Sequence, residues 1–242
     1  FIITIWLIDK SFRGGVMFKL VSLLGVEVFV EKPLCIFNAM TSKYSKIFHF
    51  DVVRKLQHEI KESDTVLDLG CGWNSLLQYC KPKYSIGVDS YEYYLQISKE
   101  KEIHSEYIHG NFSEMEFEPK SFDVVLCAQV LEHFTKEEGY KVIDQMEKWA
   151  KRKVIITTPN GFLKKTSFDE NELQEHLSGW TTYDLKRMGF RVRGSSGFKI
   201  IRQKCKPTII WRAVFNVSSM ITCHFPKQAF QLFAVKEISK NG

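Results

Sequence analysis

The spacing of apolar residues alternates between two patterns from about residue 66 to residue 192. Short runs rich in Val, Ile and Leu are each followed by a stretch with the spacing of a helix. The runs occupy residues 65–69, 84–88, 106–109, 122–127 and 153–157. Nearly continuous apolar strands that alternate with helices are typical of a parallel sheet covered on both faces. Because the connections in such sheets are right-handed, the pattern predicts a doubly wound α/β fold.

Helix signals agree with this pattern. Apolar residues recur every fourth position within residues 43–62, which predicts an amphipathic helix before the first strand. Thr135 and Glu138 have the spacing of a capping box, in which each side chain binds a free backbone N–H of the first turn. Thr181 predicts the start of another helix, and Gly189 predicts its end.

Apolar, basic segments lie on either side of the alternating region. Residues 1–42 form an N-terminal flank, and residues 43–242 form the predicted main domain. Within that domain, residues 207–225 are an apolar insertion with helical character before a last strand at residues 229–235. The insertion has four interpretations: a lid, a helix on a membrane surface, a dimer contact, or a core helix packed on the sheet.

The composition of the chain indicates a globular protein but does not specify its function. The chain has 242 residues, 44% of them hydrophobic, and is therefore long and apolar enough to fold around a core. Its net charge of +6 allows an anionic partner or a membrane surface. The six cysteines include no C-x-x-C pair, and the Asp, Glu and His residues are scattered along the sequence, so no metal site is predicted. We expect a cytoplasmic protein, with peripheral membrane contact as an alternative.

The turn after the first strand carries the strongest chemical signal. Gly70, Cys71 and Gly72 form a G-x-G turn, in which glycine lets the backbone bend tightly and approach a ligand. A dinucleotide-binding turn has a third glycine where Ser75 stands, and Asp68 lies two residues before the first glycine. A carboxylate at that point suits a cationic ligand better than a pyrophosphate. S-adenosylmethionine, with its ammonium and sulfonium groups, fits this requirement.

A second carboxylate, Asp89, ends the second strand 17 residues after Gly72. A carboxylate at this place can accept hydrogen bonds from both ribose hydroxyls of an adenosine. The alternative is that Asp89 only caps the next helix.

With these motifs the sequence resembles class I S-adenosylmethionine-dependent methyltransferases. Residues 122–134 are most similar to the group that includes the ubiquinone-biosynthesis O-methyltransferases, and the resemblance covers about residues 44–200. It implies S-adenosyl-L-methionine as the cofactor. It also implies a Rossmann-like seven-stranded sheet, mostly parallel with an antiparallel last strand, and helices on both faces.

The resemblance also implies cofactor contacts at particular positions. The matching residues are Asp68, Gly70, Cys71, Gly72, Asp89, Ser90, Asn111, Phe112, Ala128 and Gln129. At the adenine position the family often has Asp where this chain has Asn111, but an Asn oxygen can also accept from the adenine amino group.

Methyl transfer to a hydroxyl requires in-line placement of the acceptor and a base that takes its proton. His133, next to Glu132, and His176, after the fifth strand, are the candidates. The alternatives are a His133 bonded to a backbone carbonyl at a helix start and a His176 in a surface loop. Asn160 ends the fifth strand and either faces the substrate or serves the turn.

The sequence lacks the motifs of nucleic-acid methyltransferases. Cys-Ala-Gln-Val follows the fourth strand in place of the N/D-P-P-Y/F loop, and there is no Pro-Cys nucleophile. We therefore expect methyl transfer to a small-molecule, lipid or glycan acceptor, at oxygen. Two alternatives stay open: an inactive cofactor-binding subunit or scaffold, and an NAD(P)-dependent Rossmann oxidoreductase, which Asp68 and Ser75 disfavour.

Overall fold

The computed structural model describes residues 5–9, 17–21, 27–30, 50–164, 174–204 and 217–239, and the chain divides into two compact units, 1–48 and 49–242. In the first unit, strands β1 (Ile5–Asp9), β2 (Met17–Val21) and β3 (Glu27–Val30) form an antiparallel three-stranded sheet. The domain boundary expected after residue 42 stays a prediction, because residues 31–49 lie outside the described residues.

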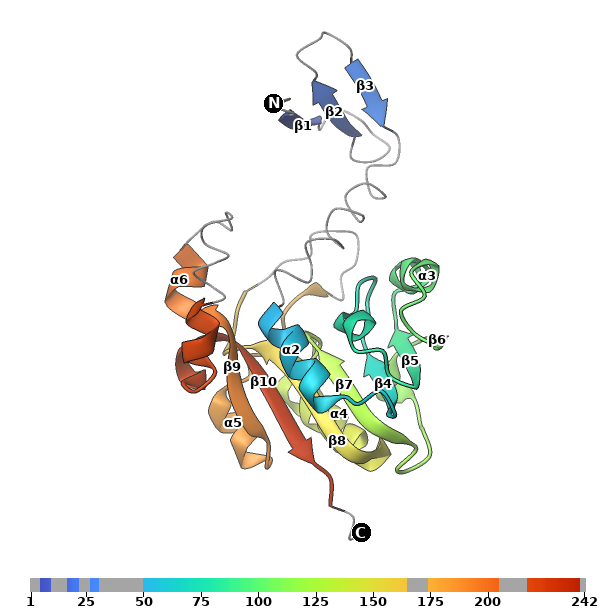
Figure 1. Cartoon of the computed structure of the whole chain (residues 1–242), viewed down its shortest axis with the longest axis vertical. Helices are drawn as coiled ribbons and strands as arrows, with labels where there is room; N and C mark the ends of the chain where they lie inside the picture. The colour runs from blue at the N-terminus through green and yellow to red at the C-terminus, as the bar shows by residue number, and fades with distance from the viewer. Residues whose placement is uncertain are drawn as a thin grey trace. The chain divides into compact units, whose positions relative to one another are not determined.

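The second unit is built on a seven-stranded sheet with the order β6-β5-β4-β7-β8-β10-β9 (Figure 1). Its strands are β4 (Thr65–Leu69), β5 (Tyr84–Asp89), β6 (Glu106–His109), β7 (Phe122–Ala128), β8 (Ala150–Pro159), β9 (Arg191–Phe198) and β10 (Ala229–Glu237). Strands β4 to β8 run parallel, whereas β10 is antiparallel to both of its neighbours. The structure thus confirms the doubly wound sheet with its antiparallel last strand.

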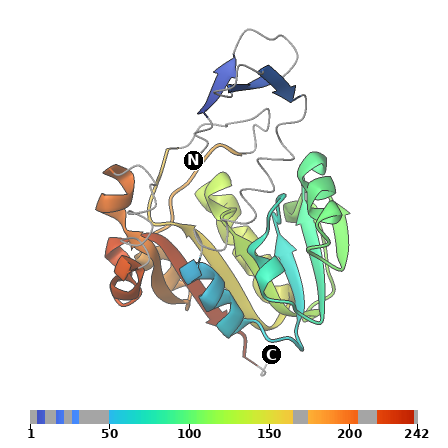
Figure 2. The same ribbon diagram turned by 45° about the horizontal axis from the view of Figure 1, so that its top comes forward.

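Helices cover both faces of this sheet. They are α2 (Phe50–Glu59), α3 (Glu92–Glu100), α4 (Lys136–Trp149), α5 (Thr182–Arg187) and α6 (Lys199–Lys204). Short 3₁₀ helices form at η1 (Leu76–Tyr79), η2 (Phe112–Glu114), η3 (Leu131–His133) and η5 (Pro226–Gln228). Helices α2 and α4 lie on opposite faces of the sheet in Figure 1, and α3 and α6 lie near its opposite ends in Figure 2.

Alternation along each central strand divides the core into two layers. In β7, Val125 and Cys127 pack in the cluster that contains the apolar side of α4. Val124 and Leu126, on the other face, pack with Leu56 of α2. All five side chains are fully buried. Strands buried on both faces carry apolar residues at every position, which explains the continuous runs in the sequence.

The predicted helix caps are present. Thr135 and Glu138 form a complete capping box at α4, with the Glu138 N–H donating to the Thr135 hydroxyl at 3.3 Å. Thr181 forms a second box at α5, and Gly189, with a φ of 86°, follows that helix. The turn after β4 differs from expectation, because it leads into the four-residue η1 rather than a longer helix. Pro82 disfavours helical backbone at the residue before it and so limits this segment.

Strand β9 was not located in the sequence. Its segment, Arg-Val-Arg-Gly-Ser-Ser-Gly-Phe, has few apolar residues, and it pairs with β10 alone at the sheet edge. Of the predicted apolar insertion, residues 207–216 lie outside the described residues, and residues 217–222 are helical. Among the residues that the structure describes, no helix has the length and apolar character needed to cross a membrane.

Glu59 joins α2 to the sheet and supplies a test of the fold. Its carboxylate lies 2.6 Å from the Lys153 ammonium and 2.9 Å from the Arg191 guanidinium. Burial raises the pKa of Glu59, but the hydrogen bonds and charges of Lys153 and Arg191 outweigh burial and lower that pKa from 4.5 to about 2. The carboxylate form therefore stabilises the folded state above pH 4.5, and this stabilisation is lost as the pH falls towards 2.

We predict that Glu59→Gln lowers the free energy of unfolding at neutral pH by about 2 kcal/mol. Each pKa unit by which the fold lowers the pKa of Glu59 is worth about 1.4 kcal/mol. The expected loss is smaller than the full pKa shift implies, because solvent screens the charge of the half-exposed Arg191. Urea unfolding at several pH values checks this. The gap between wild type and variant should close on acidification below pH 4.5, and a gap independent of pH would contradict the assignment.

Candidate active site

Two glycines shape the loop between β4 and η1, at the edge where the parallel strands end. Gly70 and Gly72 have φ angles of +65° and +57°, a region that other residues rarely adopt. A Cβ atom at Gly70 would lie 2.5 Å from Cγ2 of Val130, whereas one at Gly72 would have no atom within 4 Å. The loop is therefore tightly packed at Gly70 and open at Gly72, where a ligand can approach the backbone.

Asp89 connects this loop to the end of β5. One carboxylate oxygen accepts from the Gly72 N–H at 2.7 Å, and the other accepts from the Tyr91 N–H at 2.9 Å. Burial raises the pKa of Asp89 even though both bonds favour its charged form. Because each carboxylate oxygen offers about two acceptor positions, both oxygens keep acceptor capacity for a ligand. Asp89 thus orders the start of the next helix and is chemically suited to hold a ribose.

Asp68 has partners that the sequence did not reveal. The carboxylate is 1% exposed and accepts from the Ser75 hydroxyl, while the His104 Nε2 lies 2.9 Å from the same oxygen. The Ser75 oxygen also accepts from the Leu77 N–H at 3.1 Å, so the residue in place of a third glycine caps η1. Asp68 therefore fixes the glycine loop from within the protein, and its direct contact with a cofactor stays a prediction.

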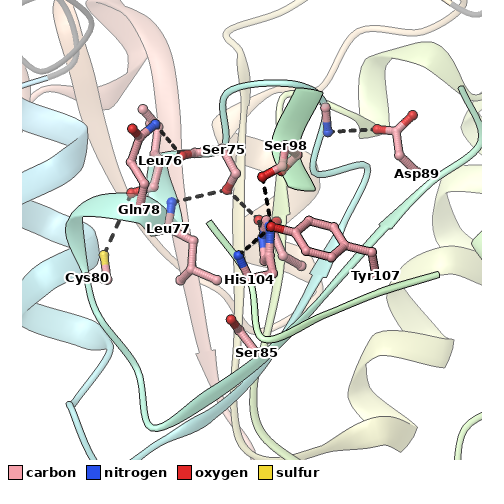
Figure 3. Close-up of polar contacts among 12 residues, drawn as sticks. Ser75, Leu76, Leu77, Gln78, Cys80, Ser85, Asp89, Ser98, His104 and Tyr107 are labelled. Carbon is pink, nitrogen blue, oxygen red and sulfur yellow. Dashed lines mark hydrogen bonds and ion pairs between the residues drawn. The ribbon is translucent and has the colours of Figure 1, made fainter. Parts of the chain in front are cut away.

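The side chain of His104 is completely buried beside the loop (Figure 3). Its backbone N–H donates to the Tyr107 hydroxyl at 2.9 Å, which in turn donates to the Ser98 carbonyl at 2.8 Å. A Cβ atom at Gly87 would lie 2.8 Å from the His104 ring, so this strand position requires glycine. No motif surrounds His104 in the sequence, and only the packing of α3 against β5 and β6 reveals its role.

The residues expected at the adenine organise the turn after β6. The Asn111 side-chain oxygen accepts from the Ser113 N–H at 3.2 Å, and its amide donates to Glu114 at 2.8 Å. Phe112 is buried and packs edge to face on Phe134, with ring centroids 5.5 Å apart. Their adenine contacts stay predictions.

Of the other expected contacts, Ser90 is exposed at the end of β5, and its carbonyl accepts from His109 at 3.1 Å. Cys71 is a buried free thiol whose pKa is raised by burial and by the nearby Asp68 and Asp89 charges. The thiol therefore stays protonated at neutral pH, which makes it a poor nucleophile.

Gln129 has a left-handed backbone, with a φ of 60°, directly after the partly buried Ala128 at the end of β7. Its side-chain NH₂ group donates to the Thr157 hydroxyl at 3.2 Å, and its side-chain oxygen accepts from the Gln231 NH₂ group at 3.0 Å. Such strained positions persist where their surroundings hold them, and they occur often at functional sites. The strand end that faces the expected cofactor is thereby held in one conformation by β8 and β10.

The segment of residues 174–180 binds the loop after β7. The Glu132 carbonyl accepts from the Leu177 and Ser178 N–H groups at 2.8 and 3.1 Å, and the Trp180 indole donates to the Leu131 carbonyl at 3.2 Å. These bonds bring two regions that are distant in sequence to the same place.

His133 and His176 meet as a result, with ring centroids 5.0 Å apart. The His133 Nδ1 lies 2.9 Å from the Glu175 carbonyl, as one alternative expected, and the His176 Nδ1 lies 2.6 Å from the Leu163 carbonyl. Because a carbonyl only accepts, Nδ1 carries the proton and Nε2 carries the lone pair in each neutral ring. His176 is 8% exposed, so the interpretation as a surface-loop histidine was wrong.

Glu132 completes this group. Its carboxylate is 2% exposed and accepts from the Thr158 hydroxyl at 3.1 Å. Atoms of Glu132, His133 and His176 that can bind a metal all lie within 4.8 Å of one another. The expectation that acidic and His residues are too scattered for such a group was wrong, because the fold joins positions far apart in the chain.

The side chain of Asn160 holds the chain at the start of β10. Its side-chain amide donates to the carbonyls of Pro226, Lys227 and Ala229 at 2.8 to 3.1 Å. These bonds support the structural interpretation of this residue over substrate contact.

A separate cavity of about 350 Å³ lies between α2, β9 and the helix at 217–222, and none of the expected cofactor contacts line it.

Comparison with known proteins finds a methyltransferase domain within the chain. Residues 67–157 match the family model described as a methyltransferase domain. An uncharacterized protein of Methanocaldococcus jannaschii is 28% identical over 158 residues, which cover 63% of this chain and 67% of that protein.

Two solved structures share the fold. An S-adenosylmethionine-dependent methyltransferase from Archaeoglobus fulgidus has a TM-score of 0.52 at 18% identity, covering 83% of this chain and 99% of that one. Another from Mesorhizobium loti has a TM-score of 0.51 at 12% identity, covering 77% and 95%. The chain thus contains a region that matches a methyltransferase domain, and its fold is shared with S-adenosylmethionine-dependent methyltransferases. The match to a methyltransferase domain favours this class over the nicotinamide-dependent alternative.

The two loop glycines allow a matched test. We predict that Gly72→Ala destabilises the protein by about 1–2 kcal/mol, the usual cost of left-handed backbone for a residue with a Cβ atom. Gly70→Ala should cost more, because its methyl group would also meet Val130. Thermal and urea unfolding of both variants check the order.

The double variant Gly70→Ala, Val130→Ala serves as the control. It should recover part of the loss if the contact with Val130 is responsible. Equal destabilisation by both single variants would contradict the packing difference between the two positions.

Proposed function

We propose that this methyltransferase binds S-adenosylmethionine at the carboxyl edge of β4 to β7 and methylates an oxygen of a small-molecule, lipid or glycan acceptor. The observation that carries the proposal is the bond between the Asp89 carboxylate and the Gly72 N–H beside open space. This arrangement combines an acceptor for ribose hydroxyls with a backbone that a ligand can approach.

The chain's residues fit the cofactor chemically. Asp89 would accept from the ribose hydroxyls, and the open backbone at Gly72 would face the methionine end. Asn111 lies at the end of the neighbouring strand, on the side expected for the adenine. When bound, the cofactor supplies a sulfonium-activated methyl group: the acceptor oxygen forms a bond to the methyl carbon, the carbon–sulfur bond breaks, and its electron pair goes to sulfur.

His133 and His176 would activate the acceptor. The backbone carbonyls that bind their Nδ1 atoms orient both rings and place the basic lone pair on Nε2. In the simplest form of the proposal, one Nε2 takes the proton of the acceptor hydroxyl as the oxygen attacks. His133 lies just beyond Gln129, on the loop that follows β7, and the His176 ring packs against it.

Exposed apolar side chains support an apolar acceptor or a peripheral membrane contact. Val217, Met220, Ile221 and Phe225 are 63%, 73%, 49% and 57% exposed on or beside the helix at 217–222. Apolar residues that gather on a surface are typical of sites that meet lipid or another protein. A lipid or a quinone precursor fits this surface better than a nucleic acid, and a cytoplasmic protein with membrane contact is the matching location.

Calorimetric titration with S-adenosylhomocysteine tests the cofactor site. We expect micromolar affinity, about −8 kcal/mol, for the wild type, and at least a tenfold loss for Asp89→Ala. The exposed Asp144→Ala is the control and should bind like the wild type. Burial raises the pKa of Asp89 above 3.8. On acidification Asp89 should therefore protonate, and the wild-type affinity should fall, at a higher pH than for an ordinary aspartate. No binding by folded wild-type protein would refute the proposal.

The histidine pair is tested by turnover. At least one of the variants His133→Gln and His176→Gln should reduce kcat by roughly 10²–10⁴-fold, the range for removal of a general base. The rate is measured as release of S-adenosylhomocysteine with an acceptor that the wild type methylates, chosen from a panel of phenols, lipids and glycans. Cofactor affinity should stay unchanged in both variants. Full activity of either variant would remove that histidine from the mechanism.

A further inference from the structure

The group formed by Glu132, His133 and His176 has the composition of a metal site. Two imidazoles and one carboxylate are the protein ligands of catalytic sites that hold zinc or iron(II) and leave positions open for substrate. Glu132 and His133 are consecutive residues of η3, and His176 comes from the segment of residues 174–180. Their candidate ligand atoms lie within 4.8 Å of one another in the part of the chain that the structure describes.

The surroundings of all three side chains also match a metal site. Histidine ligands of metals usually donate their second ring N–H to a carbonyl or carboxylate, which orients the ring. Both histidines do so here, at 2.9 Å to the Glu175 carbonyl and 2.6 Å to the Leu163 carbonyl. The Thr158 hydroxyl in turn donates to the Glu132 carboxylate at 3.1 Å. Each candidate ligand is therefore oriented by a partner outside the group.

The backbone around the group is held firmly. The Glu132 carbonyl accepts from two N–H groups of the His176 segment, so the two halves of the group are bonded to each other. Glu132 and His176 are 2% and 8% exposed, and His133 is partly exposed.

We propose that Glu132, His133 and His176 bind one divalent first-row transition-metal ion, of the kind represented by Zn²⁺, beside the methyl-acceptor position. With the ion bound, both imidazoles are ligands. The acceptor hydroxyl then loses its proton to solvent because coordination lowers its pKa, and no imidazole needs to take the proton. This role in catalysis rests on the proposed function, whereas binding of the ion does not. A metal ion at this position favours acceptors with an oxygen that can coordinate it, such as a phenol or a vicinal diol.

Titration of the full, chelator-treated chain with Zn²⁺ tests the site, and the absorption spectrum with Co²⁺ reports the ligands. Wild type and the exposed control His58→Gln should each bind one ion. His176→Gln and Glu132→Gln should bind at least tenfold more weakly. Zn²⁺ should raise the melting temperature of wild type and control, because a ligand that binds only the folded state stabilises it, but not that of the variants.

Two results would overturn the proposal: absence of stoichiometric binding in the wild type, or unchanged affinity in His176→Gln. His133→Gln, at the partly exposed position, provides a further variant should Glu132→Gln fail to fold. Titration with S-adenosylhomocysteine separates the two proposals, because the cofactor site should stay intact in every folded variant. If the wild type does not bind S-adenosylhomocysteine, the proposed function alone is refuted. If the wild type does not bind the metal ion, the metal site alone is refuted.

Discussion

The bond from the Gly72 N–H to the Asp89 carboxylate determines how the candidate active site is built. It joins the loop after β4 to the end of β5, and the left-handed backbone of Gly72 makes this close approach possible. Without this bond, the open backbone at Gly72 and the carboxylate proposed to hold the ribose would not be fixed relative to each other. The neighbouring Asp68 secures the same loop from inside, through Ser75 and His104.

Three buried carboxylates lie at or just beyond the ends of adjacent strands, and each is compensated differently. Asp68 is bonded to a hydroxyl and an imidazole, Asp89 to two backbone amides, and Glu132 to a hydroxyl beside two histidines. Buried charge is costly unless polar groups or ions offset it. Carboxylates along this edge fit the proposed ligands, because a carboxylate can accept from ribose hydroxyls, as proposed for Asp89, or bind a cation, as proposed for Glu132.

Much of the fold could be predicted from local patterns. The central strands are buried on both faces, so their residues are apolar without interruption, and the capping boxes at Thr135 and Thr181 depend on side chains only three residues apart. Strand β9 escaped prediction because an edge strand rich in Arg, Gly and Ser has no such pattern. The shortness of η1 also escaped notice, although Pro82 carried the signal.

The sequence by itself determined the fold class, the glycine loop and the position of Asp89, because each depends on residues close together in the chain or on a strand's own composition. Only the tertiary structure decided what surrounds Asp68 and that Glu132, His133 and His176 form one group. His104 reaches Asp68 across 36 positions, and the His133 ring binds a carbonyl 42 positions away. Such contacts arise when parallel strands end at a common edge and loops cross it, and no local spacing encodes which residues will meet there.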